Sequence, residues 1–461
     1  MCNKGIVKSK RYFIKSKKDE MERIVRGKRK LKKEQGITLV ALVITVIIII
    51  ILTTVAINFA FGDNGLINRA EQARDFYAND TKYTEESMSN VESYLEGMLP
   101  GGSGDGGDEP DVPEEPTLPD GWDGDKVTPE ESSDGVTVPV PIGYTASKAT
   151  GETSVNDGFV IYEGTNEVND GNVDEAKTSR NQFVWIPVPD ISQIANQTSG
   201  TDNNGRQNYQ GKLYDFSLTG ATEKTSYGQG TTSYREPDIV TDYDGTDAAI
   251  NASYFAEAIS SSMTGAQFRT QLQEEFNEMI ESVDTYGGFY IGRYETGNLE
   301  SNITTEPVVV KENESISKVN WYYMYQNSKK VAANSNVVST MIWGSMWDRT
   351  LIWLTETGDK TYAEIDDSTT WGNYNDNEEE AAGSKQPTGT SEAWKVNNIY
   401  DLAGNVDEWT LEAGSTNGRF RRGGSGDSVG SSTPVSNRDF YVNGPSYIYI
   451  YSGTRSALYV K

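Results

Sequence analysis

The sequence predicts an α+β protein in which an N-terminal apolar helix is joined by an acidic, Pro/Gly-rich linker to a large C-terminal head. Three features indicate this class. Residues 37–61 form an uncharged run of twenty-five amino acids. Residues 100–135 hold six of the fifteen prolines and twelve acidic residues, a composition that disfavours a packed core. From residue 136 onward, short β-branched or aromatic runs alternate with turn-rich stretches and with fewer helical patterns.

Residues 1–36 form a basic leader. They carry fourteen Lys or Arg and four acidic residues, which leaves a net charge of −37 for the rest of a chain whose total is −27. A basic segment ahead of a strongly acidic body indicates two compartments. The overall acidity also argues against a nucleic-acid partner, because binding phosphates requires a basic surface.

Residues 37–61 are predicted to cross a membrane as one helix. At about 1.5 Å per residue the run spans roughly 37 Å, which exceeds the ~30 Å hydrocarbon layer. The alternative is a buried core helix, although such helices seldom run this far without a polar face. The basic leader should keep the N-terminus in the cytoplasm, which places everything after residue 61 outside the cell.

The junction between leader and apolar run, KKEQGITLVALVITVI, resembles a type IV prepilin leader. The resemblance implies cleavage after Gly36 by a prepilin peptidase, methylation of the new N-terminal Ile37, and interaction with the pilus assembly machinery. Major pilins carry a glutamate at the fifth mature position, whereas this chain has Ala41. The departure fits a minor, pilin-like subunit.

Residues 62–99 are expected to continue as a stalk helix, because apolar residues recur at helical spacing along them. A juxtamembrane helix without a partner is the alternative. Residues 100–135 are expected to be a disordered acidic tether between this stalk and the head.

Residues 136–461 are expected to form the head, a length sufficient for one sizeable core. Strands are predicted where apolar runs are short, and helices where apolar residues recur at i, i+3 and i+4. The predicted strands are 158–162, 182–188, 288–294, 308–310 and 456–460, and the predicted helices are 247–259, 264–284 and 320–334. The polar insertions 196–246 and 357–393 are expected to be surface excursions.

The run NNIYDLAGNVDEWT from Asn397 to Thr410 resembles the sulfatase-modifying, formylglycine-generating enzyme superfamily. Further segments resemble that family in the same order: FVWIPV, GGFYIGRYETG, the strand-and-helix unit from Pro307, RFRRGGSG and GTRSALYVK. The resemblance implies an irregular C-type-lectin-like fold over most of residues 180–461.

The redox activities of that superfamily are not expected here. Formylglycine-generating members use paired cysteines and sulfoxide-synthase members bind iron through histidines, whereas this chain has no histidine and one cysteine, Cys2. The same counts exclude Ser-His-Asp and Cys-His nucleophiles and imidazole-ligated metals. The sequence therefore predicts a protein that is not an enzyme.

The candidate ligand-binding residues lie near the C-terminus. Tyr447, Tyr449 and Tyr451 alternate with two isoleucines, so in an extended segment the tyrosines share one side. One interpretation buries the isoleucines and presents the tyrosines, with Asn437 and Arg438 nearby, to a protein or glycan. The other interpretation turns the tyrosines inward as core aromatics.

Calcium is the one cofactor that the resemblance suggests. Some members of the superfamily bind Ca²⁺ through the asparagine, a nearby backbone carbonyl and the glutamate of a G-N-x-x-E-W motif, which are Asn405, Val406 and Glu408 here. Oxygen ligands suit this ion. The alternative is that Glu408 hydrogen-bonds a buried loop.

Together these features predict a non-catalytic adhesin or receptor, at the cell surface or associated with a pilus, whose head binds an extracellular protein or glycan. One alternative is a permanently membrane-anchored receptor diversified by a retroelement, which predicts a near-copy of the gene's 3′ end elsewhere in the genome. Another alternative is a cofactor-free enzyme.

Prepilin processing is tested by the intact mass of the protein extracted from membranes. Cleavage after Gly36 followed by methylation predicts a chain that begins at N-methylated Ile37. A mass that still includes the basic leader would contradict this prediction and would indicate a permanent anchor.

Overall fold

The computed structural model describes residues 118–224, 236–237, 249–297, 309–314, 320–331, 334–378, 383–414, 419–441 and 445–461. They belong to the compact unit Pro113–Lys461. The basic leader, the apolar run 37–61 and the predicted stalk lie outside the described residues. Within the described part of the chain, no helix is both long enough and apolar enough to cross a membrane.

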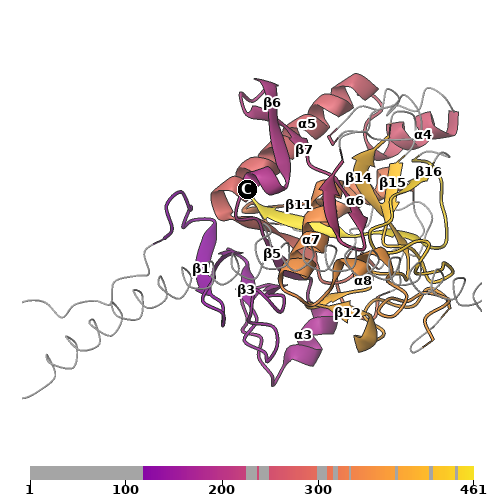
Figure 1. Cartoon of the computed structure of the whole chain (residues 1–461). Helices are drawn as coiled ribbons and strands as arrows, with labels where there is room; N and C mark the ends of the chain where they lie inside the picture. The colour runs from indigo at the N-terminus through magenta and orange to yellow at the C-terminus, as the bar shows by residue number, and fades with distance from the viewer. Residues whose placement is uncertain are drawn as a thin grey trace, which may run out of the picture. The chain divides into compact units, whose positions relative to one another are not determined.

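The described residues form a mixed fold of many strands and few helices (Figure 1), which confirms the mixture predicted from the sequence. The main sheet has six strands in the order β11-β18-β10-β5-β4-β3, and every neighbouring pair is antiparallel. The strands are β3 Tyr144–Ala146, β4 Val160–Glu163, β5 Gln182–Pro187, β10 Gly288–Gly292, β11 Val337–Met341 and β18 Ser456–Val460. The strand nearest the C-terminus therefore pairs on both sides.

The central strands of this sheet are covered on both faces. Every residue of β10 and β18 is buried, as are five of the six residues of β5. Strands buried on both faces carry continuous apolar runs instead of alternating polar and apolar residues. This explains the unbroken runs in 182–188, 288–294 and 456–460. The described residues of the predicted strand 308–310, which are 309 and 310, contribute an isolated bridge between Gly297 and Val309 and no named strand.

A second sheet of four strands has the order β16-β15-β14-β17. Strand β14 pairs antiparallel with β15 and parallel with β17, and β15 pairs antiparallel with β16. The bounds are β14 Asp407–Ala413, β15 Arg419–Arg422, β16 Asp439–Tyr441 and β17 Ser452–Thr454. The remaining strands form two-stranded sheets: β1 Val127–Glu131 with β2 Thr137–Pro141, β6 Ala195–Thr201 with β7 Gln207–Gly211, β8 Tyr214–Ser217 with β9 Gly220–Glu223, and β12 Lys395–Val396 with β13 Ile399–Tyr400.

Helices cover the sheets, and the longest of them packs against β10 and β18. The described helices are α3 Val173–Ser179, α4 Ala249–Ala258, α5 Gly265–Tyr286, α6 Trp321–Ser328, α7 Gly344–Glu356 and α8 Tyr362–Asp366, with 3₁₀ turns η1 Ile191–Gln193 and η2 Glu392–Trp394. Helix α5 begins with a capping box between Thr264 and Gln267 and ends at Gly287, whose φ is 78°. These local signals explain why its bounds follow from the sequence.

The predicted helices differ from the described ones in extent and in number, since α3, α7 and α8 have no predicted counterpart. Helix α6 ends at Ser328, although the predicted segment runs to residue 334. Helix α7 is absent from the predictions, and its sequence GSMWDRTLIWLTE has ten buried residues. A helix that is buried on most sides lacks the polar face on which amphipathic periodicity depends.

The ordered head begins before residue 136, so the predicted linker is too long at its C-terminal end. Strand β1 pairs with β2 in register from Val127 opposite Pro141 to Glu131 opposite Thr137. Val127 packs with Tyr286 and Val460, and Trp122 lies against Tyr286 at a ring-centroid distance of 6.0 Å. Apolar contacts on the head thus order the end of an acidic, proline-rich segment.

The two polar insertions differ from each other in burial. The described part of 196–246 includes the β6–β7 and β8–β9 hairpins, whose residues are mostly exposed or half-buried. By contrast, 357–393 contains the buried Trp371 and Tyr374, and the Tyr374 hydroxyl donates to the Gly423 carbonyl at 2.6 Å. The expectation of a surface excursion is therefore wrong for this part of the second insertion.

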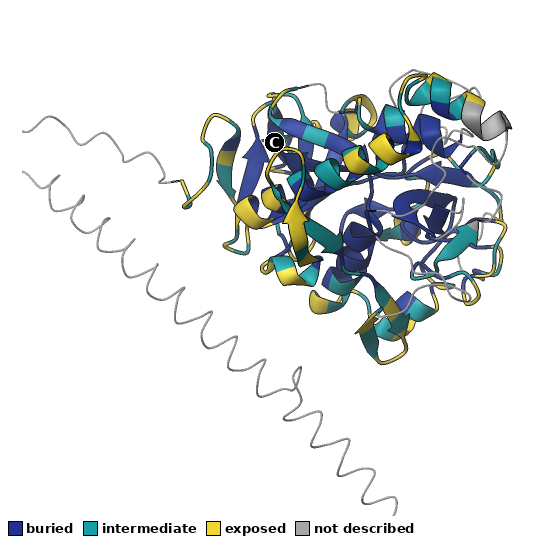
Figure 2. Cartoon of the chain, turned by 90° about the horizontal axis from the view of Figure 1, so that it is seen from above, coloured by how far each residue is buried: buried dark blue, intermediate teal, exposed yellow. Residues whose placement is uncertain are grey.

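Buried residues run through the interior of the head (Figure 2). Tryptophans contribute several of the largest side chains of this core. Trp321, Trp343, Trp347 and Trp409 are almost completely buried. The indole N–H of Trp321 donates to the Thr410 carbonyl at 2.9 Å, and that of Trp347 donates to the Val435 carbonyl at 3.0 Å. These bonds satisfy the polar edge of rings whose large apolar area stabilises the core.

The ion pair between Glu408 and Arg455 offers a test of the core. Both side chains are fully buried and 2.6 Å apart. We expect Arg455→Met to lower the free energy of unfolding by about 3–5 kcal/mol, because the Glu408 carboxylate would remain buried without its cation. Urea unfolding of the full-length protein, followed by tryptophan fluorescence, measures this loss.

The matched control is Lys148→Met, which removes the more exposed pair that Lys148 forms with Glu130 at 2.9 Å. That substitution should lower the free energy of unfolding by no more than about 1 kcal/mol. Equal losses for the two variants would contradict the role assigned to the buried pair.

Candidate ligand-binding site

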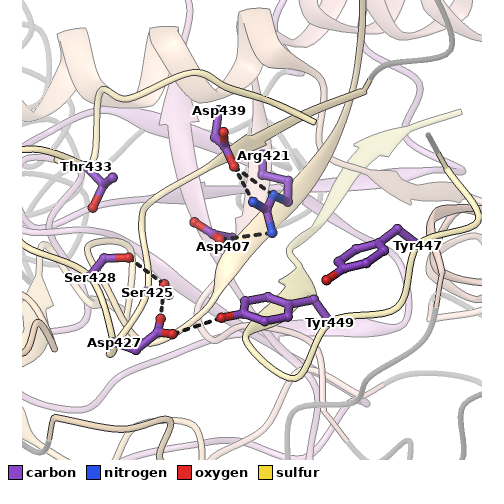
Figure 3. Close-up of a pocket in the computed structure, with 9 residues that line it drawn as sticks. All are labelled: Asp407, Arg421, Ser425, Asp427, Ser428, Thr433, Asp439, Tyr447 and Tyr449. Carbon is purple, nitrogen blue, oxygen red and sulfur yellow. Dashed lines mark hydrogen bonds and ion pairs between the residues drawn. The ribbon is translucent and has the colours of Figure 1, made fainter. Parts of the chain in front are cut away.

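A cavity of about 340 Å³ opens where three strands of the second sheet meet the loops around them (Figure 3). Asp407 begins β14, Arg421 lies in β15, and Asp439 begins β16. The register places Arg421 directly opposite both Trp409 and Asp439. Loop residues complete the lining: Ser425, Asp427, Ser428, Thr433, Tyr447 and Tyr449.

Arg421 is held between two of the cavity's carboxylates. Its Nη1 lies 3.1 Å from Asp407 Oδ2 and donates to Ser452 Oγ at 3.0 Å. Its Nε donates to Asp439 Oδ2 at 3.1 Å, and its Nη2 also bonds that oxygen. The guanidinium lies 5.6 Å from the centre of the Trp409 ring. These partners fix the position of the Arg421 guanidinium.

Asp407 is the most deeply placed acid of the cavity, with only 8% of the residue exposed. Asp407 lines the cavity, and no described residue donates a hydrogen bond to its Oδ1. Burial raises the pKa of Asp407 to about 7. Arg421 opposes this rise in pKa, and Asp439 and Asp427 add to it.

The tyrosines form one wall of the cavity. The rings of Tyr447 and Tyr449 stack with centroids 6.2 Å apart, and Tyr449 and Tyr451 are 5.7 Å apart. The Tyr449 hydroxyl donates to Asp427 Oδ2 at 2.9 Å, while Ser425 Oγ donates to Asp427 Oδ1 at 2.8 Å. Burial, followed by the bond to Asp427, raises the pKa of Tyr449 to about 12.

The structure brings the three tyrosines side by side, in a turn-containing segment instead of a strand. All three are half-buried, so they are neither fully presented nor part of the core. The companion isoleucines do not form a buried row, because Ile450 is 49% exposed. Each of the two interpretations is therefore incomplete.

The other two predicted ligand-binding residues lie outside this cavity lining. Arg438 belongs to a buried ion cluster, in which its Nε donates to Glu412 Oε1 at 2.8 Å and its Nη2 pairs with Asp348. Asn437 is half-buried, and its backbone N–H donates to the Pro434 carbonyl at 2.8 Å. Successive residues of an extended segment point to opposite sides, so Asp439 reaches the cavity and Arg438 does not.

The same alternation recurs in three neighbouring strands. In β14, in β15 and at the start of β16, one residue faces the cavity and its neighbour in the chain joins a buried ion pair: Asp407 and Glu408, Arg421 and Arg422, and Asp439 and Arg438. The cavity and the buried ion network therefore lie on opposite faces of the second sheet. The available sequence signal was the presence of Asp407 and Arg421 in segments that resemble motifs of a known fold family, GNVDEWT and RFRRGGSG, but their meeting depends on the register between strands.

The residues predicted to bind calcium are engaged with protein groups. Asn405 Oδ1 accepts hydrogen bonds from Asn373 Nδ2 at 3.0 Å and from the Gln386 N–H at 2.8 Å. The Val406 N–H donates to Glu295 Oε1 at 3.2 Å, and the Glu408 carboxylate pairs with Arg455. No group of three or more acidic residues placed to hold a metal ion occurs among the described residues. Asn405 Oδ1 and the Glu408 carboxylate thus have protein partners, and calcium binding stays a prediction.

The loop that supplies these residues has unusual backbone geometry. Positive φ angles occur at Asn397, Asn398, Asp401 and Asn405, with values from 43° to 62°. Asparagine and aspartate tolerate this region better than other L-residues. Asn398 Nδ2 donates to three carbonyl oxygens, those of residues 151, 157 and 158, so its side chain fixes the turn.

A second cavity of about 230 Å³ is a weaker candidate. Its lining includes Glu275, Glu278, Lys329 and Lys461, so its charges balance. Lys329 already pairs with Glu275. The cavity at Asp407 combines charge imbalance with an aromatic wall and is therefore the candidate site.

No family model matches this sequence, and no curated protein matches it. Among solved structures, a match is found to Treponema denticola variable protein 1, with 14% sequence identity and a TM-score of 0.23. The match covers 61% of this chain and 96% of that protein. We infer neither fold nor function from a likeness at this score.

The raised pKa of Asp407 predicts a pH-dependent stability difference. Folding raises the pKa of Asp407 from 3.8 to about 7, so the folded state favours the protonated carboxyl. This preference contributes fully to stability below pH 3.8, and the contribution is lost as the pH rises through 7. Asp407→Asn does not titrate, so the variant should gain about 1–3 kcal/mol on the wild type between pH 5 and pH 8. Urea unfolding of the full-length protein at each pH measures the difference.

The control for this series is Asp174→Asn, at an exposed position in α3. Its difference from the wild type should stay constant across the same pH range. A constant difference for Asp407→Asn as well would show that burial of Asp407 does not have the predicted effect.

Proposed function

We propose that this protein is a non-catalytic surface receptor or adhesin, whose head binds an extracellular protein or glycan in the cavity between Asp407, Arg421 and Tyr449. The observation on which the proposal depends is the cavity itself, which joins an aromatic wall to a rigid set of charged groups. Tyrosine offers a large amphipathic contact surface with few rotatable bonds. Such a wall suits recognition.

Preorganisation supports a binding role. Arg421 is fixed by Asp407, Asp439 and Ser452, and Tyr449 is fixed by Asp427. Side chains that are ordered before a ligand arrives lose little conformational entropy on binding. The head therefore presents its contact groups in one geometry.

The composition favours binding over catalysis. The head contains neither histidine nor cysteine, which are common general bases and nucleophiles. The best-placed acid of the cavity, Asp407, forms an ion pair with Arg421 instead of standing free as a general base. We therefore assign the cavity to recognition.

The head is proposed to be a C-type-lectin-like domain related to the sulfatase-modifying superfamily. This is supported by the positions of the segments that resemble that family. FVWIPV, GGFYIG and SALYV occupy β5, β10 and β18, which are adjacent in the main sheet. The resemblance of NNIYDLAGNVDEWT extends to the loop that leads into β14.

The N-terminal region is proposed to anchor the head at the membrane or in a pilus. The uncharged run 37–61 and the basic leader before it support a single span with a cytoplasmic N-terminus. The junction at Gly36 and Ile37 supports prepilin processing. In this arrangement the acidic linker extends the head away from the lipid.

The test is capture of extracellular partners by the full-length protein in non-ionic detergent, on arrays of glycans and of purified surface proteins. Tyr447→Ala and Tyr449→Ala should each weaken the captured interaction at least about tenfold, as truncation of a central aromatic residue does. Thr219→Ala, in the exposed β8–β9 turn, is the control and should bind like the wild type. Unchanged capture by both tyrosine variants would refute the proposed function.

A further inference from the structure

The cavity carries an excess of negative charge. Three carboxylates line it, those of Asp407, Asp427 and Asp439, against the single guanidinium of Arg421. No other lysine or arginine belongs to this lining. Two carboxylates already share Arg421, so the cation that the cavity contains does not balance its acids.

Two carboxylate oxygens are available to a ligand. Asp407 Oδ1 and Asp439 Oδ1 accept no hydrogen bond from a described residue, because the bonds from Arg421 reach the Oδ2 atom of each side chain. Asp407 is almost completely buried, whereas 37% of the Asp439 side chain is exposed. The acceptors thus run from the inner end of the cavity to its rim.

A carboxylate group that is largely withdrawn from water is costly to ionise unless enough donors surround it. The pKa of Asp407, raised by burial to about 7, reflects this cost. The charged and titratable groups around Asp407 include Arg421 on β15 and Asp439 on β16, and three residues from the loops: Asp427, Tyr449 and Tyr374. A cation at Oδ1 would supply the missing donor and would favour the ionised form.

The tyrosine wall limits the shape of a ligand. The Tyr447 and Tyr449 rings stack on each other, and the Arg421 guanidinium lies 6.0 Å from the centre of the Tyr449 ring. A sugar stacks its C–H face against an aromatic ring, and here other protein groups already cover part of the tyrosine ring faces. A slender alkyl chain can pass the ring edges and place a charged group beyond them.

From these observations we infer that the cavity receives the basic side chain of a protein partner, a lysine or an arginine, with its cation at Asp407 and Asp439. The alkyl part of that side chain packs along Tyr447 and Tyr449. This inference rests on the proposed function of the cavity and specifies the ligand group that it recognises.

The experiment measures binding of short peptides to the full-length protein in non-ionic detergent at pH 8 by calorimetry. The probe is acetyl-Gly-Gly-Lys-Gly-Gly-amide, and its matched neutral forms carry norleucine or Nε-acetyl-lysine in place of lysine. We expect the lysine peptide, and the corresponding arginine peptide, to bind at least about tenfold more tightly than the neutral forms. Added salt should weaken only the charged peptides.

Substitutions connect the binding to the cavity. Asp407→Asn and Asp427→Asn should each weaken the lysine peptide about three- to tenfold and leave the norleucine peptide unchanged, since only the Coulombic attraction is reduced. Asp427 is exposed, so its variant keeps the test valid if Asp407→Asn does not fold. Asp174→Asn removes an exposed charge from α3, outside the cavity lining, and should leave binding of the lysine peptide unchanged.

The outcomes separate this inference from the proposed function. Equal binding of lysine and norleucine peptides would overturn the inference, as would binding of oligomers of glucosamine or N-acetylglucosamine without binding of the lysine peptide. In either case, loss of partner capture by Tyr449→Ala would still support a recognition site. Unchanged capture by both tyrosine variants would instead refute the recognition site itself.

Discussion

The buried ion pair between Glu408 and Arg455 joins the two sheets of the head. Arg455 separates β17 from β18, and its guanidinium also donates to the carbonyl oxygens of Gly292 in β10 and Tyr400 in β13. One cation thus connects the second sheet, the main sheet and the two-stranded sheet of β12 and β13. A charge buried without partners is very costly, so these segments are held in the one arrangement that brings Arg455 and its acceptors together.

The candidate site depends on this arrangement. Because Glu408 points toward Arg455, the preceding residue, Asp407, points to the other side of the strand. The same alternation directs Arg421 and Asp439 into the cavity, while Arg422 and Arg438 pair with Asp348 inside. The buried network therefore sets the positions of the groups that a ligand meets. The side chains that line the cavity are held in place because their neighbours in the chain form buried ion pairs in the core.

Much of the fold could be predicted from local signals. The capping box at Thr264 and the glycine after Tyr286 mark helix α5, and unbroken apolar runs mark β5, β10 and β18. Helix α7 could not be predicted in this way, because burial on most sides removes its polar face. The start of the head was also hidden, since Trp122 and Val127 are ordered by contacts with Tyr286 and Val460, far along the chain. For the site, two of the three tyrosines named from the sequence line the cavity, whereas Arg438, which was expected near them, belongs to a buried ion cluster.

The sequence by itself determined which chemistries the head can use and where most central strands and the longest helix lie. These properties follow from residue counts and from spacing along the chain, which need no knowledge of distant contacts. Only the tertiary structure decided that Asp407, Arg421, Asp427 and Asp439 surround one cavity, and that Asn405 and Glu408 serve a buried loop. The physical reason is that Coulombic attraction and desolvation depend on distance and burial in space. Strand register and long-range packing set both, and no local pattern of residues specifies them.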